Sequence, residues 1–193
     1  YGNSRTFDNV IRIEIEIAEG DAIHSSQIES IQEKLISLNL FKSVEVNEVE
    51  IEDGIINLEI KVEEKQTGTV NAGVSVGTLE GLSVLAGLKE RNFYGTGRSL
   101  ELLLNTSEDK NEFIFSTTDR LSYENDIDIS YNANFKQEDF SSSSSYKLDT
   151  LSTGGGVTYK INKNITHNID LDYVLKDYSV TNSSTVSDSI GKS

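Results

Sequence analysis

Residues 67–99 read TGTVNAGVSVGTLEGLSVLAGLKERNFYGTGRS, and this stretch decides the fold. From residue 69 to residue 78, apolar side chains alternate with small or polar ones. The apolar positions are Val70, Ala72, Val74 and Val76, and the positions between them are Thr69, Asn71, Gly73, Ser75 and Gly77. Strict alternation predicts a β-strand with one apolar and one polar face. After a short turn at 78–81, residues 82–93 repeat the pattern, and residues 94–97 turn the chain again.

Every long segment downstream alternates in the same way. The further strand candidates are residues 98–106, 111–118, 126–136, 151–161 and 165–178. Together with the first two they make about seven strands, and strands of roughly 9–11 residues can cross a bilayer when tilted. We therefore expect one continuous antiparallel up-and-down meander with too few strands to close a large membrane barrel.

The connections between these segments alternate in length. Residues 94–97 and 162–164 are short, and 119–125 is predicted as a moderately long turn. Residues 137–150, which include five consecutive serines, and the Ser/Thr-rich tail from residue 180 are predicted as long loops. Outer-membrane barrels have short periplasmic turns and longer outer loops, so the pattern is typical of them.

Alternation alone leaves two architectures open. In a soluble sandwich the apolar faces would form a core, whereas in a membrane barrel they would meet lipid and the polar faces would line a wet lumen. The polar faces here are rich in Asn, Ser, Gly and Asp and poor in Lys–Glu pairs, which favours a lumen.

Residues 1–66 have a different pattern. Residues 7–17 fit a strand by the spacing of Ile11, Ile13, Ile15 and Ile17, and also fit a helix face. Residues 26–38 predict a helix that Ser26 caps, with Glu29 completing a capping box. Its core stripe is Ile28, Ile31, Leu35 and Leu38.

After this helix Asn39 is predicted to end it in the left-handed conformation. Residues 42–51 and 55–63 are predicted strands joined through Asp53-Gly54, a strong hairpin signal. In the second strand Ile56, Leu58, Ile60 and Val62 face one way. We expect the helix stripe to be buried on this hairpin.

Charge and composition exclude several classes of function. The net charge is −15, with six Lys/Arg against fifteen Asp/Glu in residues 1–66. Such a chain should repel nucleic acid. No Cys is present, which excludes a disulfide framework, and no apolar run is long enough for a transmembrane helix. The absence of Met indicates a fragment or a processed chain.

Candidate catalytic and metal sites are weak. His24 lies in a predicted loop and His167 on an apolar strand face, and neither has an acidic neighbour placed to form a dyad. The series Asp126, Asp128, Ser130, Asn132 lacks the central glycine of a calcium loop and alternates with apolar residues. We expect no enzymatic activity, no metal and no cofactor.

Two groups of residues carry a family resemblance. Thr67-Gly68, the strand after it, the Gly77…Gly81 turn and Arg91-Asn92-Phe93-Tyr94-Gly95-Thr96-Gly97 resemble the entry into the barrel in the BamA family of outer-membrane β-barrel assembly factors. Gly2-Asn3-Ser4-Arg5-Thr6, Ala18-Glu19-Gly20-Asp21-Ala22 and Leu40-Phe41-Lys42-Ser43-Val44 resemble the last POTRA domain of that family.

The resemblance implies a fold for each half. Residues 1–66 would be a periplasmic POTRA-like α+β domain, α-α-β-β, whose first strand is missing, with residues 7–17 helical. Residues 67–193 would be the N-terminal part of a transmembrane β-barrel in the bacterial outer membrane, an all-β antiparallel meander.

The resemblance also implies a function. The family inserts nascent outer-membrane proteins into outer-membrane lipid, and its first barrel strand is the edge of a lateral gate, here residues 69–77. Its last POTRA domain docks a periplasmic lipoprotein, for which Glu19 is the candidate contact. Two alternatives remain: a POTRA-bearing translocator that secretes proteins, and a soluble acidic β-rich binding module.

Overall fold

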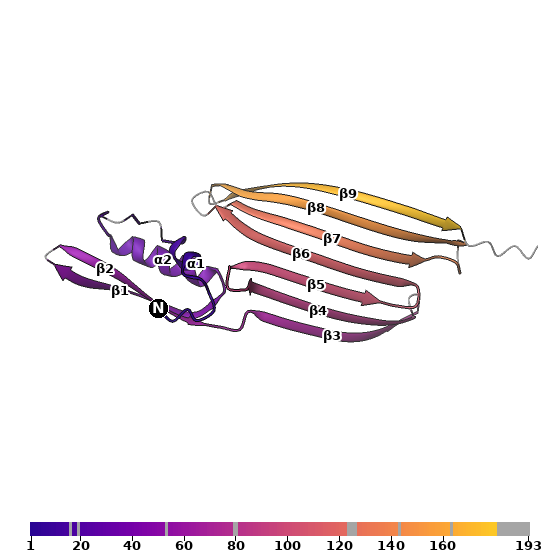
Figure 1. Cartoon of the computed structure of the whole chain (residues 1–193), viewed down its shortest axis with the longest axis horizontal. Coiled ribbons are helices and arrows are strands. Elements are labelled where there is room, and N and C mark those ends of the chain that lie inside the picture. Colours follow the sequence, from indigo (N-terminus) through magenta and orange to yellow (C-terminus); the bar gives the residue numbers. More distant parts are fainter. Residues whose placement is uncertain are drawn as a thin grey trace, which may run out of the picture.

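In a computed structural model the chain forms two sheets of very different size, and the description covers residues 1–15, 17–18, 20–52, 54–78, 81–122, 127–142, 144–162 and 164–180. A two-stranded sheet with two helices, which we call the N-terminal unit (residues 1–66), lies at one end of a seven-stranded sheet, which we call the large sheet (Figure 1). The order of elements confirms the expected α-α-β-β followed by an all-β meander.

The first helix is short. α1 spans Asp8–Arg12, and turns at Ile13 and Glu14 follow it, so the helix expected within residues 7–17 is confirmed over one turn and the alternative strand is wrong. Val10 and Ile11 of α1 are buried, because one helical turn suffices to direct both toward the small sheet.

The second helix, α2 (Ser25–Ser37), begins two residues earlier than a helix capped by Ser26 would. Its N-cap is His24, whose backbone N–H donates to Gln27 Oε1 over 2.9 Å, so the predicted box of Ser26 and Glu29 is wrong. Gln27 takes this role because it occupies the third position after the cap, where a side-chain oxygen reaches back. Asn39 has φ of +61°, which confirms the left-handed stop.

A hairpin of β1 (Phe41–Glu52) and β2 (Ile55–Glu64) covers the helices. Gly54 has φ of +82° in the turn, as a tight hairpin requires, and Asp53 lies outside the described residues. Of the predicted stripe, Ile31 and Leu35 are buried, Leu38 is partly buried against the same cluster, and Ile28 is only partly buried. The core of the unit consists of Val10, Ile11, Ile31, Leu35, Leu40, Phe41, Val44 and Val62.

Tyr1 continues the small sheet on its other side. Its amino group donates to Ile60 O over 2.7 Å, and Val62 N–H donates to Tyr1 O over 3.0 Å. These two bonds flank Lys61 on one strand, which is the pattern of parallel pairing. The outer edge of β2 is therefore where a parallel strand of the expected β-α-α-β-β domain would lie.

The large sheet is a meander in strict sequence order. Its strands are β3 (Gly68–Gly77), β4 (Gly81–Phe93), β5 (Arg98–Thr106), β6 (Lys110–Ser122), β7 (Ile127–Asp139), β8 (Tyr146–Asn162) and β9 (Ile165–Val180). Each pairs antiparallel with its neighbours in sequence. Among the described residues the sheet is open, with β3 and β9 at its two edges (Figure 1).

Two predicted connections are wrong because the strands beside them are longer than predicted. β7 runs to Asp139 and β8 starts at Tyr146, so most of the predicted loop 137–150 is paired strand. Lys147 forms an ion pair with Asp139 across this pairing, with 2.6 Å between nitrogen and oxygen. Likewise β6 continues to Ser122, so only the end of the predicted turn 119–125 lies beyond the strand.

One face of the large sheet is apolar across all seven strands. Register brings Val74 opposite Val84, Phe113 opposite Phe135 and Leu151 opposite Leu175. Many of these side chains are more than a third exposed. Their cross-strand pairing, with none of the described elements covering them, excludes the two packed sheets of a soluble sandwich. None of the described helices is long and apolar enough to span a membrane.

Candidate functional site: the free edge of β3

β3 carries nine residues that the sequence predicts as a client-binding edge. They are Thr69, Val70, Asn71, Ala72, Gly73, Val74, Ser75, Val76 and Gly77. All ten residues of β3 are exposed, and among the described residues its partner is β4 alone. The other side of β3 therefore presents backbone N–H and C=O groups that can pair with a further strand.

Six of the ten pairs between β3 and β4 contain Gly, Ala or Ser. Ala72 lies opposite Ala86, and Gly77 lies opposite Gly81. A Cβ added at Gly73 would meet no atom within 4 Å. Because few side chains interlock across this ladder, its register is weakly specified and its backbone is open to approach.

The two faces of β3 differ in chemistry. Val70 and Val74 are each 76 % exposed and Val76 is 83 % exposed, all on the apolar face. Asn71 and Ser75 lie on the opposite face, across from Gly87 and Ser83. A strand added to this edge with the same alternation would continue both faces of the sheet.

The start of β3 is fixed to both sheets. Lys65 N–H donates to Leu40 O over 3.1 Å, which ties the linker to the N-terminal unit. The Glu90 carboxylate of β4 accepts hydrogen bonds from the Thr67 hydroxyl and from Asn92 N–H, the latter over 2.8 Å. The linker that leads into β3 is thus held by hydrogen bonds to the N-terminal unit and to β4.

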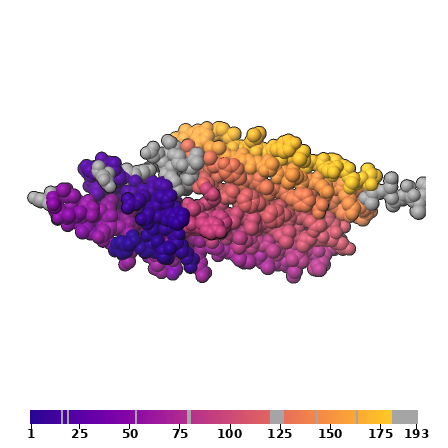
Figure 2. Space-filling view, in the orientation of Figure 1, coloured from indigo at the N-terminus to yellow at the C-terminus, as the bar shows by residue number. Residues whose placement is uncertain are grey.

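The N-terminal unit also contacts the turn between β4 and β5. Phe7 N–H donates to Gly95 O over 2.8 Å, and Asn92 Nδ2 donates to Thr6 Oγ1 over the same distance. Figure 2 shows the N-terminal residues, in indigo, packed directly against strands of the large sheet. Sequence reasoning missed this joint: Gly95 and Gly97, which both have positive φ in the structure, indicated a turn but not what the turn contacts.

The Glu64 carboxylate accepts several hydrogen bonds from the loop that contains Thr6. Glu64 accepts from Thr6 N–H over 2.7 Å, from Ser4 Oγ over 2.9 Å and from Arg5 N–H over 3.1 Å. Partial burial acts to raise the pKa of Glu64, but the hydrogen bonds from Thr6, Ser4 and Arg5 outweigh it and lower that pKa. Glu64 therefore organises the loop that meets the large sheet.

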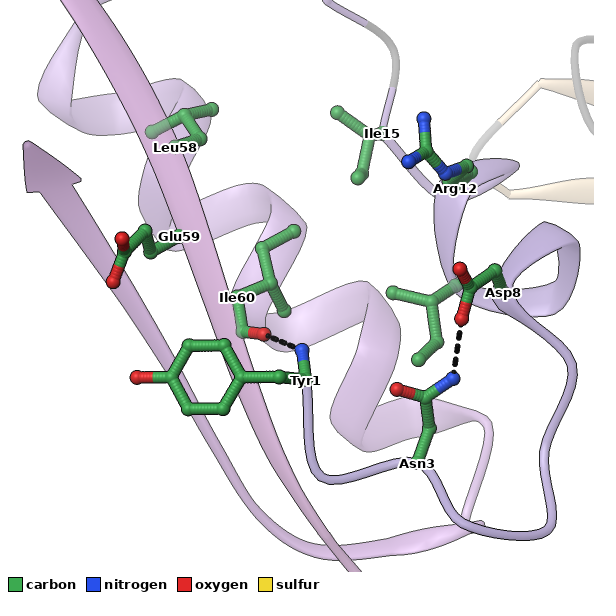
Figure 3. A pocket seen from close by; sticks show the side chains of 9 residues that line it. Tyr1, Asn3, Asp8, Arg12, Ile15, Leu58, Glu59 and Ile60 are labelled. Carbon is green, nitrogen blue, oxygen red and sulfur yellow. Dashed lines mark hydrogen bonds between the residues drawn. The ribbon is translucent and has the colours of Figure 1, made fainter.

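A pocket of about 340 Å³ lies beside the outer edge of β2 (Figure 3). Its lining comes from residues near Tyr1, from α1 and from β2, and Asn3 Nδ2 donates to Asp8 Oδ1 at its mouth over 2.6 Å. Leu58 and Ile60 form its apolar wall. Tyr1, which pairs with the outer edge of β2, also lines this pocket. The pocket therefore lies at the edge of the small sheet.

The remaining predicted sites are placed as follows. Glu19 and Asp126 lie outside the described residues. His24 caps α2, and His167 Nδ1 lies 2.6 Å from the Tyr159 hydroxyl, across the β8–β9 ladder. In the described part of the chain, three or more metal-ligating side chains do not come together.

Two family models match the chain. The model of the Omp85 superfamily domain matches residues 92–191, and the POTRA model, described as a surface antigen variable number repeat, matches residues 1–65. The first covers more than half of the chain. This chain belongs to the Omp85 superfamily.

Curated relatives agree. The outer membrane protein assembly factor BamA of Nitratidesulfovibrio vulgaris is 30% identical over 140 residues, which is 72% of this chain and 18% of that protein. The BamA of Neorickettsia risticii is 25% identical over 160 residues, 83% of this chain and 22% of that protein. The chain thus spans about a fifth of the length of these relatives.

Solved structures give the same result. BamA from Haemophilus ducreyi lacking POTRA domains 1–3 superposes with a TM-score of 0.78 at 25% identity, over 93% of this chain and 35% of that one. CdiB from Acinetobacter baumannii, at 15% identity and a TM-score of 0.55 over 88% of this chain and 36% of that one, shares the fold. The chain is similar to a BamA fragment and is an outer-membrane protein whose POTRA unit lies in the periplasm.

Proposed function

We propose that the protein to which this chain belongs folds β-barrel proteins and inserts them into the outer membrane, and that β3 is the edge that receives them. In this proposal residues 1–66 are a POTRA-like periplasmic domain and residues 67–193 are the N-terminal part of the barrel. The observation that carries the proposal is the exposed edge of β3, in whose ladder to β4 six of the ten pairs contain Gly, Ala or Ser.

The mechanism uses backbone pairing rather than covalent chemistry. An incoming strand pairs with the free N–H and C=O groups of β3, so its own backbone is satisfied before it meets lipid. Gly73 and Ala72 impose little side-chain selection, and the edge therefore accepts strands of many sequences. The weakly specified register lets the client strand leave again.

The partners follow from this mechanism. Nascent outer-membrane proteins are the clients, outer-membrane lipid surrounds the apolar face, and periplasmic lipoproteins of the assembly machine dock on residues 1–66, with Glu19 as the candidate contact. Nucleic acid is not a partner, because the chain carries a net charge of −15. Neither an enzymatic step nor a cofactor is part of the proposal.

Crosslinking tests the edge directly. In the intact protein, Ser75→Cys should crosslink to a cysteine in the terminal strand of a client under mild oxidation. Ser130→Cys is the matched control, since Ser130 lies on β7, which is paired on both sides. If the crosslink at Ser75→Cys is no more abundant than at Ser130→Cys, β3 is a wall strand and the proposal is wrong.

A backbone substitution gives a second test. Gly73→Pro removes a ladder donor from β3 and should impair client insertion. Gly73→Ala is the control, because a Cβ at this position meets no atom within 4 Å, and insertion should remain at the wild-type level. Normal insertion by the proline variant would contradict the role of the β3 backbone.

A further inference from the structure

The end of β4 holds Asn92 in an unusual position. The β4–β5 register is interrupted between Glu90 and Phe93, so Arg91 and Asn92 lie outside the regular pairing. This bulge frees the Asn92 side chain from the alternation of the strand. Its amide then reaches toward the N-terminal unit instead of toward either face of the large sheet.

The neighbours of Asn92 fix the direction of its hydrogen bonds. Gly97 N–H donates to Asn92 Oδ1 over 2.8 Å, and a backbone N–H can only donate. The amide nitrogen is therefore the atom that faces Thr6, and Thr6 Oγ1 must accept from it, over 2.8 Å. The hydroxyl proton of Thr6 remains available to the Glu64 carboxylate, with which the Thr6 side chain is hydrogen-bonded.

The result is one continuous series of donors and acceptors across the joint. It runs from Gly97 N–H through the Asn92 amide and Thr6 to the Glu64 carboxylate, which also accepts from Thr6 N–H over 2.7 Å. Thr6 is only 3% exposed, so water does not substitute for these partners. Phe7 N–H adds a parallel backbone bond to Gly95 O.

From this geometry we infer that Asn92 is a positioning residue that latches the N-terminal unit to the large sheet and fixes the angle between them. The linker at residues 65–67 is one attachment, and one attachment alone permits rotation. The latch, formed by the bonds of Asn92 to Thr6 and of Phe7 to Gly95, is a second attachment, across β4 from the first, and two attachments suppress rotation. The inference does not depend on whether β3 receives clients.

Distance measurements on the intact protein in lipid nanodiscs test the latch. Spin labels are placed at Glu33→Cys on α2 and Asp109→Cys at the far end of β5–β6, both exposed, and pulsed electron resonance records the distance distribution. Wild-type protein should give one narrow distribution. Asn92→Ala should reduce the relative weight of that distance about tenfold, because a buried hydroxyl and an N–H each lose a partner.

Two further variants separate hydrogen bonding from packing. Asn92→Asp keeps the shape but replaces the donor facing Thr6 by an acceptor, and it should broaden the distribution at least as much as Asn92→Ala. Thr6→Val keeps the volume and removes the hydroxyl, with the same expected effect. Thr96→Ala is the control: its hydroxyl bonds Phe93 O within the turn over 2.7 Å, and the distribution should not change.

The combination of variants decides the inference. Because Asn92 and Thr6 form one series, the double variant Thr6→Val/Asn92→Ala should broaden the distribution no more than either single change. Strictly additive effects, or a narrow distribution in every variant, would overturn the latch while leaving the Ser75→Cys crosslinking result unaffected. Retained heat-dependent gel mobility in each variant shows that the barrel itself has folded.

Discussion

Gly95 lies directly against Arg5: a Cβ built on Gly95 would come within 1.9 Å of the Arg5 carbonyl oxygen. The same residue has φ of +76°. Gly95→Ala should therefore destabilise the joint by at least about 1–2 kcal/mol from the backbone conformation alone, with the clash adding to it. The measurement is the urea midpoint at which a protease begins to cut between the two units of the intact protein.

The matched control is Gly73→Ala, which has space around the new methyl group. Its midpoint should equal that of the wild-type protein. A wild-type midpoint for Gly95→Ala as well would mean that the β4–β5 turn and the Arg5 loop are not in contact in solution.

Glu64 makes the joint sensitive to acid. Its pKa is lowered, against the effect of partial burial, by hydrogen bonds from Thr6, Ser4 and Arg5. A group with a depressed folded-state pKa contributes stability that is complete above its unfolded pKa, about 4.3 for Glu, and is lost as the pH falls through the folded value. We expect the joint to lose protease resistance as the pH falls below about 4.3.

Glu64→Gln should abolish most of this dependence and lower the resistance at neutral pH, because an amide keeps one acceptor and loses the charge. Glu63→Gln is the control: Lys42 lowers the pKa of Glu63 through a hydrogen bond and its charge, and this exposed pair joins β1 to β2. If both variants keep the wild-type pH profile, Glu64 does not organise the joint.

Much of the fold was predictable because apolar and polar residues alternate along its strands. The ends of β5 match the predicted segment, and the free edge of β3 follows from its place at the start of the meander. The ends of β7 and β8 were not predictable by this route. There charged residues lie in paired strand: Lys147 of β8 forms an ion pair with Asp139 of β7, and Lys136 with Glu138 within β7, whereas charged runs in a sequence usually indicate loops.

The joint could not be predicted for a different reason. Thr6 and Asn92 are 86 positions apart, and their bond depends on a bulge that has no signature in the alternation of β4. The cap of α2 was mispredicted for a local reason: the observed box of His24 with Gln27 lies two residues before Ser26 with Glu29, and histidine is not a preferred capping residue.

The small core rests on Leu35, which is completely buried. Leu35→Ala should lower the free energy of unfolding of residues 1–66 by about 2–5 kcal/mol, because a cavity replaces the side chain. The neighbouring Ile36 is 41% exposed, and Ile36→Ala should change it by much less. Pulse proteolysis of the intact protein measures both, and equal losses would mean that the helix presents another face to the hairpin.

The apolar face of the large sheet can be tested at Leu171. This residue lies mid-way along β9, opposite Gly155, and is 80% exposed on the face that should meet lipid. Asp172 follows it on the other face, opposite Gly154, where Asn132 Nδ2 lies 3.4 Å from its Oδ1. Leu171→Arg should reduce the free energy of folding into vesicles by about 2–4 kcal/mol, the cost of arginine near the bilayer midplane.

Asp172→Asn changes charge at the adjacent position without placing it in lipid, and folding into vesicles should be nearly unchanged. The two faces alternate along the strand. Folding into vesicles should therefore be impaired by the change at residue 171 and nearly unaffected by the change at residue 172. If Leu171→Arg folds as well as Asp172→Asn while protease protection of the sheet is retained, the apolar face is covered by protein rather than by lipid, and the membrane-facing assignment of the sheet is wrong.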